Sequence, residues 1–358
     1  MALTWPREVE LLKRLVATPS VSGEEEAVAQ LCVELVREWG LPVRLDDAGV
    51  TISLESRQAG PTLALVSHLD VVPPGEGWTH EPWTPHIEDG KLYGRGSGDA
   101  KASVAAMLCA ARDVAYGGGP ARGRLLVILG FGEETKNTSM PDAVARVGPV
   151  DAAIVGEPTN LDFAIAQRGL MMIDLVAHGD QRHAGYADAD GTYENAAVRL
   201  ARDLVKLQGL CREREHPVLG HVTITPTMIT GGVSRNVTPP TVKAVLDIRS
   251  TPDWSHDEIA AVLRGALESE VVVTSTRLVP CETPANSTLL PILRGARPPG
   301  KRYGSPTCSD WVFLRDRDTI KCGPGTSRRS HRADECVDLS EVTEARELYA
   351  RAAMEYLK

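Results

Sequence analysis

Histidine and carboxylate side chains recur at the ends of apolar, β-branched stretches along this 358-residue chain. They form a nitrogen- and oxygen-rich set without a thiolate, which suits Zn²⁺, Co²⁺ or Mn²⁺. In two-metal hydrolase sites the ions lie ~3.5–4 Å apart and share a water molecule. The ordered set indicates such a hydrolase, although no pair within it is decisive. Its members are His68, Asp70, Asp99, Glu133, Glu134, Glu157 and His331.

The first two stand in His68-Leu69-Asp70, directly after the apolar stretch Thr62–Ser67. On extended backbone, side chains two residues apart point to the same face. One of the two can therefore bind a metal while the other orients it. For this tripeptide alone, a surface histidine beside a turn aspartate is the better explanation.

Asp99 ends the glycine-rich turn 94–99 (G-R-G-S-G-D), before an alanine-rich helical stretch. Glycine lets the backbone pass close to a bound group. The alternative is a dinucleotide-binding loop, but these glycines do not fit G-x-G-x-x-G, and a polar segment precedes them instead of a buried strand. We therefore interpret Asp99 as a carboxylate placed where a helix begins.

Glu133 and Glu134 follow the apolar stretch Arg124–Gly130. Adjacent carboxylates beside apolar sequence repel each other unless cations compensate them or one takes up a proton. At a dinuclear site one could bind metal while the other acts as a general base towards water. Glu157 repeats the arrangement of strand followed by carboxylate. Taken singly, a solvated acidic loop and, at His331, a surface histidine are the ordinary explanations.

The elements that must position these residues alternate between helix and strand in the first half of the chain. Such alternation predicts an α/β layer with a mostly parallel sheet, whose sites form at the carboxyl ends of the strands. Ser22 is expected to cap the second helix. The predicted helices are Arg7–Ala17, Glu24–Trp39 and Ala100–Tyr116, and the predicted strands are Thr62–Ser67, Arg124–Gly130 and Asp151–Gly156.

The pattern changes near Arg168-Gly169, where strands of alternating polarity begin. The order β-α-β-β-α-β over roughly 110 residues predicts an inserted ferredoxin-like α+β domain. We therefore predict two domains, 1–168 with 284–358 and 169–283. The elements expected after the boundary are strands Leu170–Ala177, His221–Thr225, Thr241–Arg249 and Val271–Arg277, and helices Glu194–Gly209, Asp257–Ser269 and Ser340–Leu357.

Bulk properties exclude several classes. The net charge of −9 argues against nucleic acid or an anionic membrane as partner. The seven cysteines show no C-x-x-C spacing, so a zinc ribbon or disulfide scaffold is not expected. The N-terminal residues lack a signal-peptide core, and no run approaches ~20 apolar residues. We expect a soluble, cytoplasmic protein.

Seven segments together resemble the M20 metallopeptidase family, especially its branch of N-acetylornithine deacetylase, succinyl-diaminopimelate desuccinylase and LysK-type hydrolases. They span nearly the whole chain in the family's order. The resemblance implies a zinc-peptidase-like catalytic domain (1–168 and 284–358) and a lid and dimerisation domain (169–283). The segments are Ser67–Val72, Leu92–Lys101, Gly132–Thr135, Val155–Pro158, Gly231–Val237, Asp247–Arg249 and Gly323–Glu335, the last containing His331.

The resemblance also implies a role for each residue and two Zn²⁺ ions per subunit, with Co²⁺ or Mn²⁺ able to substitute. Asp99 would bridge the ions, His68 and Glu157 would complete one, and Glu134 and His331 the other. Glu133 would be the general base and then the acid, and Asp70 would orient His68. A glutamate at position 157 is more similar to the deacylase branch than to the peptidase branches.

Further residues match the family's substrate contacts. His183 matches a lid histidine that reaches the partner subunit's active site, where it would stabilise the oxyanion. The tyrosine-containing segment after His183 departs from the family's usual proline. Arg249 and Asn236 match positions that contact a substrate α-carboxylate, a group that arginine binds bidentately. Ser309 and Asp310 are candidate pocket residues. His183 could instead be an ordinary loop histidine, and Arg249 and Asn236 could be structural residues of a sheet and a turn.

The resemblance leads us to expect a homodimeric zinc amidohydrolase that removes an N-acyl group from an amino acid. N-acetyl-L-ornithine, in arginine biosynthesis, is the first expected substrate. The alternatives are N-acetylcitrulline, N-succinyl-diaminopimelate, or a LysK-type conjugate of lysine or ornithine with a carrier protein. From another class, an inactive M20-like binding protein is the alternative. The remaining histidines, including His80 and His86, carry no motif and are expected to be surface residues.

Overall fold

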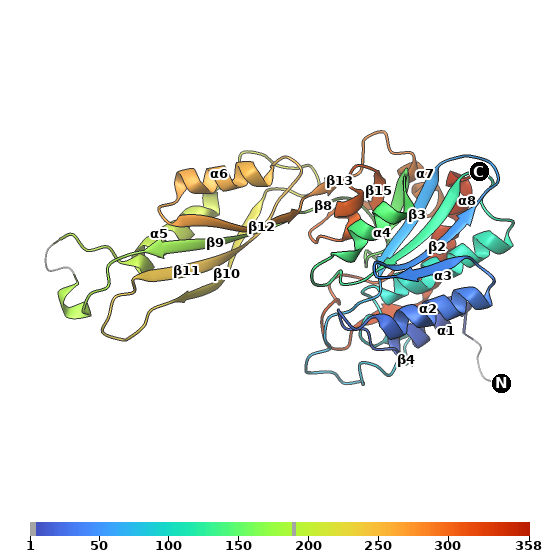
Figure 1. Cartoon of the computed structure of the whole chain (residues 1–358), viewed down its shortest axis with the longest axis horizontal. Helices are drawn as coiled ribbons and strands as arrows, with labels where there is room; N and C mark the ends of the chain where they lie inside the picture. Colours follow the sequence, from blue (N-terminus) through green and yellow to red (C-terminus); the bar gives the residue numbers. More distant parts are fainter. Residues whose placement is uncertain (1–4, 188–190) are drawn as a thin grey trace. The chain divides into compact units, whose positions relative to one another are not determined.

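The computed structural model describes residues 5–187 and 191–358 (Figure 1). The chain divides into two compact units. Unit 1 comprises 5–165, Thr283–Tyr303 and Ser309–Lys358, and unit 2 comprises Ala166–Glu282 and Gly304–Cys308. The assignment of catalytic and lid roles to 1–168 with 284–358 and to 169–283 stays a prediction.

A large mixed sheet forms the centre of unit 1, in the order β1-β2-β6-β3-β7-β15-β8-β13, with β14 paired to β8. β3 is parallel to β6 and β7, and β15 is parallel to β7, whereas β1, β2 and β8 pair antiparallel. The parallel centre confirms the predicted α/β class. The strands are β1 (Val43–Asp46), β2 (Gly49–Glu55), β3 (Thr62–His68), β6 (Arg124–Gly130), β7 (Ala152–Val155), β8 (Phe163–Gln167), β13 (Cys281–Glu282), β14 (Arg302–Ser305) and β15 (Asp318–Lys321).

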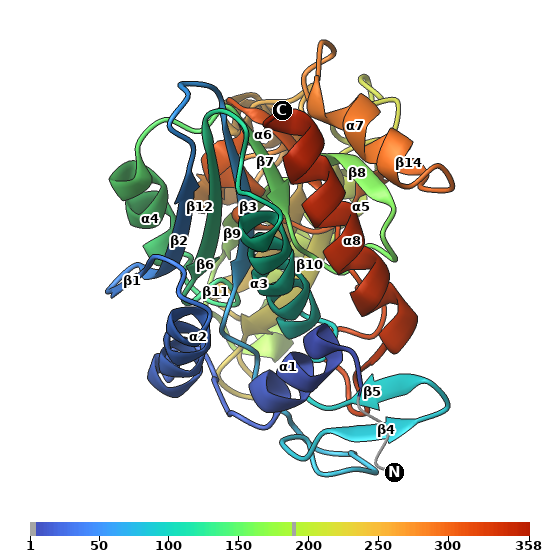
Figure 2. The ribbon, with the colours of Figure 1, turned by 90° about the vertical axis from the view of Figure 1, so that its right-hand side faces the viewer.

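Helices α3 and α8 pack against each other in front of the strands in Figure 2. Because α3 is rich in alanine, neighbouring helices approach it closely, and most of its residues are buried. The helices of unit 1 are α1 (Arg7–Val16), α2 (Glu26–Glu38), α3 (Lys101–Tyr116), α4 (Ser139–Val147), α7 (Leu289–Ala296) and α8 (Leu339–Tyr356). A smaller sheet joins β4 (His86–Glu88), β5 (Lys91–Tyr93) and β16 (Cys336–Asp338), and a 3₁₀ turn spans Asp310–Leu314.

The predicted cap of the second helix is wrong. Helix α2 begins at Glu26 with Glu25 as its N-cap residue, three positions after Ser22. The Ser22 hydroxyl instead donates a hydrogen bond of 2.7 Å to Asp70 Oδ2. Ser22 therefore does not cap α2. It binds a carboxylate of the candidate site that is distant in sequence.

Unit 2 has the predicted β-α-β-β-α-β order, with an antiparallel sheet ordered β10-β11-β9-β12. Alternate side chains of β9 and β11 are buried, and Ile173 and Leu175 share a core with Leu200 of α5 and Leu263 of α6. This ferredoxin-like arrangement confirms the predicted α+β insert. Its elements are β9 (Leu170–His178), α5 (Ala196–Lys206), β10 (Thr223–Gly231), β11 (Thr241–Arg249), α6 (His256–Ala266) and β12 (Glu270–Leu278), with 3₁₀ turns at Ala184–Tyr186 and Leu207–Gly209.

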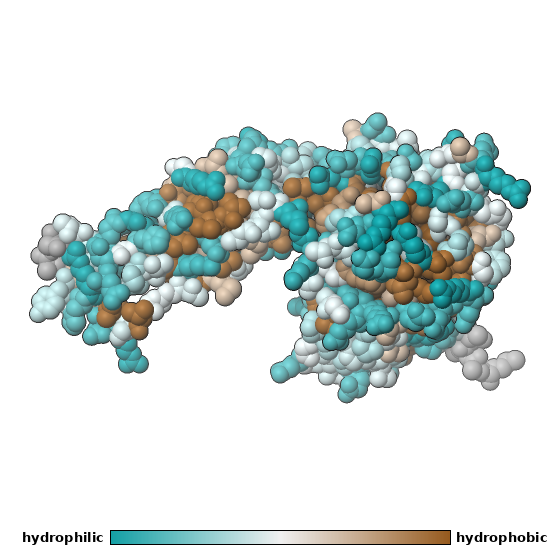
Figure 3. Space-filling view, viewed as in Figure 1, coloured by the Kyte–Doolittle hydropathy of each residue, from teal (hydrophilic) through white to brown (hydrophobic). Residues whose placement is uncertain are grey.

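Strand β10 lies at one edge of the unit 2 sheet and is exposed along most of its length. Met228 and Ile229 on this strand each expose 59% of their surface. Figure 3 shows brown, apolar surface on unit 2 among teal, polar residues. Across residues 5–187 and 191–358, no helix combines the length and apolar character that crossing a bilayer requires.

Candidate metal centre

Three parallel strands bring the candidate ligands of unit 1 to one edge of the sheet. Strand β3 ends at His68, the loop after β6 carries Glu133 and Glu134, and Glu157 follows β7. Because β6 and β7 both pair parallel with β3, their carboxyl ends meet at the same edge. This topology explains why each of these polar side chains follows a buried apolar strand.

Asp99 lies between two imidazole rings. Its Oδ1 is 3.5 Å from His68 Nε2, and its Oδ2 is 3.5 Å from His331 Nε2. Glu157 Oε1 lies 3.7 Å from His68 Nε2, and Glu134 Oε1 lies 2.9 Å from His331 Nε2. The structure therefore brings all five candidate ligands together in unit 1, as two clusters that share Asp99.

The His68 ring is held by a hydrogen bond to the backbone of its own segment. Its Nδ1 lies 3.0 Å from the backbone carbonyl of Asp70, and because a carbonyl only accepts, Nδ1 carries the proton. In the neutral ring, Nε2 is then the unprotonated nitrogen, and it faces Asp99 and Glu157. Within the described residues, His68 Nε2 and Glu157 Oε1 are buried and make no hydrogen bond. Two buried, unsatisfied ligand atoms facing each other fit a cation between them.

The charges of the cluster also favour a bound cation. Burial and the nearby Asp99 carboxylate raise the pKa of Glu157 to about 8. Asp99 and Glu134 raise the pKa of His331 to about 10. Burial opposes protonation of His68, but Asp70, Asp99 and Glu157 outweigh it and raise the pKa of His68 well above its ordinary value. The carboxylates outnumber the histidines, so the cluster attracts positive charge.

Asp70 is buried behind these ligands. Its Oδ1 accepts a hydrogen bond of 3.0 Å from the Glu133 amide, and its Oδ2 accepts bonds from the Glu134 amide (3.1 Å) and the Ser22 hydroxyl. Oδ1 also lies 3.4 Å from His68 Nδ1. One carboxylate thus fixes the end of β3 and the loop after β6 together, which is how a carboxylate behind a metal-binding histidine acts.

Glu133 is half-buried beside this cluster. Burial and the neighbouring Glu157, together with Asp310 and Glu134, raise the pKa of Glu133 well above its usual range. Asp310 is buried and accepts a hydrogen bond of 3.1 Å from Asn137 Nδ2. Ser309 is also buried, and its hydroxyl accepts a bond from the Trp311 amide. The structure therefore places Asp310 within electrostatic reach of Glu133.

Sequence reasoning gave no role to Glu335, which holds the loop that carries Asp99. Its Oε1 accepts hydrogen bonds of 2.9 Å from the amides of Gly98 and Asp99, and its Oε2 accepts from Gly96 and the buried guanidinium of Arg95. Gly96 has φ +79°, and a Cβ there would lie 2.5 Å from a Val71 methyl carbon. In the sequence, the feature that could have pointed to this role is the position of Glu335 four residues after the candidate ligand His331.

The remaining predicted residues belong to unit 2. The exposed His183 accepts a hydrogen bond of 3.1 Å at Nδ1 from the Gly185 amide, so its neutral ring carries the proton on Nε2. Asn236 Oδ1 accepts a bond of 2.9 Å from Ser234, and its carbonyl accepts from the Ala184 amide. Arg249 forms two hydrogen bonds with Asp247, of 2.8 and 3.1 Å. His183 and Asn236 therefore lie in adjoining segments of unit 2.

Comparisons with known proteins agree with this geometry. Residues 64–355 match peptidase family M20/M25/M40. A relative from Methylorubrum populi named succinyl-diaminopimelate desuccinylase is 30% identical and aligns with 97% of this chain and 97% of its own length.

Two solved structures share the fold over 98% of both chains. Aminopeptidase PepT from Bacillus cereus has a TM-score of 0.84 at 19% identity. The YXEP protein from Bacillus subtilis, described as a dinuclear metal-binding peptidase of the M20 family, has a TM-score of 0.76 at 14% identity. With the family match covering most of the sequence, the chain belongs to peptidase family M20/M25/M40 and is a metal-dependent amidohydrolase.

Proposed function

We propose that this protein removes the succinyl group from N-succinyl-diaminopimelate, a step of lysine biosynthesis. The observation that carries the proposal is the relative of that name, which aligns over nearly all of both chains. The cluster of His68, Asp99, Glu134, Glu157 and His331 supplies a matching metal centre. The sequence alone favoured N-acetyl-L-ornithine, and the comparisons support the succinyl alternative better.

The proposed reaction uses Glu133 as the group that moves protons. Two Zn²⁺ ions, replaceable by Co²⁺ or Mn²⁺ and bound by the five ligands, would act as Lewis acids towards the amide carbonyl. Glu133 takes a proton from the attacking water and later gives it to the leaving amine. Burial and neighbouring carboxylates raise the pKa of Glu133 when no cation is bound, and two bound cations would lower it, so that Glu133 is ionised before it accepts the proton. Asp70 keeps His68 and the Glu133 amide in place throughout.

His183 is the proposed oxyanion donor, acting at the site of a partner subunit. The hydrogen bond from Gly185 to its Nδ1 leaves the Nε2 proton free to donate, which is the tautomer that the role requires. The exposed edge strand β10, with Met228 and Ile229, supports a homodimer through unit 2. Arg249 and Asn236 are the proposed contacts to substrate carboxylates, with Arg249 pre-oriented by Asp247.

A substrate panel tests the proposal. Zinc-loaded protein would be assayed for amine release from succinyl-diaminopimelate, acetylornithine, acetylcitrulline, acetyl-lysine and simple dipeptides. We expect the succinyl substrate to give the largest kcat/KM, and Glu133→Gln to lower kcat by about 10²–10⁴-fold with its zinc content unchanged. A preference for acetylornithine would restore that assignment. Turnover of none of the substrates, with or without zinc, would favour a carrier-protein conjugate or a binding protein.

A further inference from the structure

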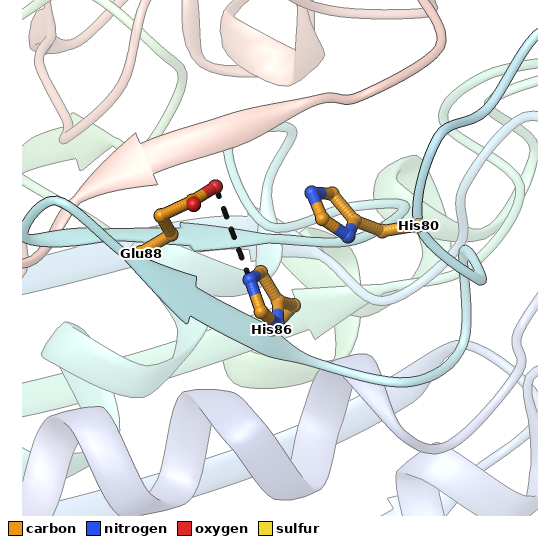
Figure 4. A group of neighbouring side chains, drawn as sticks. All are labelled: His80, His86 and Glu88. Carbon is orange, nitrogen blue, oxygen red and sulfur yellow. Dashed lines mark ion pairs between the residues drawn. The ribbon is translucent and has the colours of Figure 1, made fainter.

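A second cluster of potential metal ligands lies at the hairpin β4–β5 of unit 1 and the loop that precedes it. His80, His86 and Glu88 each offer one ligand atom, and these atoms all lie within 4.8 Å of one another. Figure 4 shows the His80 ring beside the ion pair between His86 and Glu88, whose Nε2 and Oε2 atoms are 4.0 Å apart. None of these residues takes part in the proposed reaction.

The backbone fixes two of the three side chains on the same face. His86 and Glu88 are two residues apart on β4, so they point the same way. Strand β4 is held by register pairs with β5, where His86 faces Tyr93, and β5 is paired in turn with β16. Leu92 of β5 is fully buried and anchors the hairpin.

The third side chain, His80, is held over this face from a separate loop. Its ring stacks on the His86 ring, with centroids 4.2 Å apart and planes inclined by 18°, and its centroid lies 5.5 Å from that of Tyr93. The neighbouring Thr79 amide donates a hydrogen bond of 2.9 Å to Asp334 Oδ1. The His80 loop is therefore tied to the segment that leads from His331 into β16.

We propose that His80, His86 and Glu88 form a peripheral binding site for a divalent transition-metal ion such as Zn²⁺ or Cu²⁺. Two imidazoles and one carboxylate are the ligand set that such ions prefer over Ca²⁺ or Mg²⁺. Tetrahedral zinc with bonds of ~2.0–2.1 Å needs its ligand atoms about 3.3 Å apart, so the cluster must contract. The half-exposed side chains of His86 (44%) and Glu88 (58%) have room to turn inward.

The proposed ion would join the His80 loop to the β4–β5 hairpin. Water would complete its coordination, because the site is open to solvent. Lys91 stands opposite Glu88 in the hairpin register. Through Thr79 and Asp334, the ion would steady the segment that carries His331. The site would therefore be structural and not catalytic.

Copper spectroscopy separates this site from the candidate centre. At the centre, each ion would have one histidine ligand, His68 or His331, whereas the peripheral ion would have two. Cu²⁺ bound to the full chain at pH 7.5 is expected to show a two-imidazole pattern in pulsed electron paramagnetic resonance, and His80→Gln is expected to reduce it to one. Absence of the two-imidazole pattern from the unsubstituted protein would overturn the proposal, whatever the centre binds.

Metal stoichiometry gives the second test. In equilibrium dialysis against Zn²⁺, we expect His86→Gln and Glu88→Gln to bind one ion fewer per chain than the unsubstituted protein, or the same ion at least ~10-fold more weakly. The matched control is His178→Gln, because the exposed His178 faces Glu270 at 3.5 Å and belongs to no cluster of potential metal ligands among the described residues. Equal zinc binding by the unsubstituted protein and His86→Gln contradicts the proposal.

Discussion

At the scale of single residues, the carboxylate of Asp70 joins three segments that are distant in sequence. It accepts from Ser22, which precedes α2, and from the two amides of the loop after β6, while it also faces His68 at the end of β3. A buried acceptor with this many donors fixes the direction of every group around it. The precision of the centre therefore depends on a residue that would not itself bind the metal.

The substitution Asp70→Asn tests this dependence. An asparagine would present an amide group where one of the backbone donors now points, so the His68 ring and the Glu133 loop would lose their shared support. We expect metal affinity or kcat/KM to fall by about 10–100-fold. Ser22→Ala, which removes one of the bonds to the same carboxylate, should cost only about 0.5–1.5 kcal/mol of stability. Zinc competition with a chelating dye would measure the zinc affinity of both variants. An equal loss of zinc affinity in Asp70→Asn and Ser22→Ala would contradict the role assigned to Asp70.

The sequence indicated the residues whose chemical type suits metal binding or proton transfer. It missed the roles of residues that hold those side chains in place through hydrogen bonds. Histidines and carboxylates after apolar strands stand out, and the structure brings those of unit 1 together. The roles of Ser22 and Glu335 do not stand out, because a side chain that bonds to a group distant in sequence leaves no local pattern. Ser22 donates to the Asp70 carboxylate, and Glu335 accepts from backbone amides of the Asp99 loop. Glu25, whose carboxylate accepts from the amides of Gly23 and Gly132, is a further example.

At the scale of elements, the loop before α3 depends on one buried ion pair. Glu335 and Arg95 are each about 1% exposed, and the carboxylate also accepts from three amides of the Asp99 loop. Removing one partner of a buried pair leaves an uncompensated charge. The loop is therefore expected to lose its shape when either partner is neutralised.

For Glu335→Gln we expect a loss of about 3–5 kcal/mol in the free energy of unfolding, together with weaker zinc binding through Asp99. Urea unfolding followed by far-ultraviolet circular dichroism would measure the first, and equilibrium dialysis the second. Asp338→Asn is the control, because its contact with Arg329 is long (3.7 Å) and partly exposed. A loss as small as that of the control would contradict the assigned role.

In unit 2, the buried His256 at the start of α6 makes stability depend on pH. Its Nδ1 lies 3.0 Å from the Thr276 carbonyl and its Nε2 2.8 Å from the Ser250 hydroxyl, so the neutral ring satisfies both partners. Burial lowers the pKa of His256 below 6.5, although the adjacent Asp257 opposes this. Its stabilising contribution is therefore complete above pH 6.5 and is lost as the pH falls through the lower folded-state pKa.

His256→Gln removes this titration. We expect the unfolding free energy of the unsubstituted protein to fall more steeply between pH 7.5 and pH 5 than that of the variant. Urea denaturation at several pH values, followed by circular dichroism, would show the difference in slope. Parallel pH profiles for the two proteins would mean that His256 titrates alike in the folded and unfolded states.

Elements were predictable where burial produced a clear apolar pattern. Arg124–Gly130 and Thr241–Arg249 are strands at the predicted bounds, because one is buried almost throughout and the other alternates. Strand β10 was predicted to end near Thr225 but continues to Gly231. Its exposed side chains and the register shift after Pro226 remove the alternation that identifies a strand. The short β15, Asp318–Lys321, has charged residues at both ends and was missed.

At the scale of the whole molecule, the five candidate ligands all belong to unit 1. Metal binding should therefore stabilise unit 1 selectively. At free metal 100-fold above Kd, each bound ion adds about 2.7 kcal/mol, which corresponds to roughly 5–10 °C per ion for a unit of this size. We expect chelation to lower the thermal transition of unit 1 by that amount for each ion removed and to leave that of unit 2 in place. Differential scanning calorimetry with and without chelator would measure this, and equal shifts of both transitions would contradict it.

The fold class and the family could be predicted from the sequence, because the motifs and the alternation of elements extend along the whole chain. The acyl group could not. Substrate choice depends on the shape of a binding pocket, to which Arg249 and Asn236 are proposed to contribute, and pocket shape leaves no sequence spacing to detect. The proposal of a succinyl substrate therefore rests on the similarity to the relative from Methylorubrum populi and not on residue types.

The position of β15 in the sheet has a consequence for synthesis on the ribosome. β15 pairs with β7 inside unit 1, yet the chain of unit 2 is made between them. The emerging polypeptide therefore carries the apolar edge Ala152–Val155 without its neighbour until more than 150 further residues have been added. An unpaired apolar edge of this kind invites pairing with other chains. Folding in the cell should consequently depend on chaperones that shield the edge while the second half of the protein is translated.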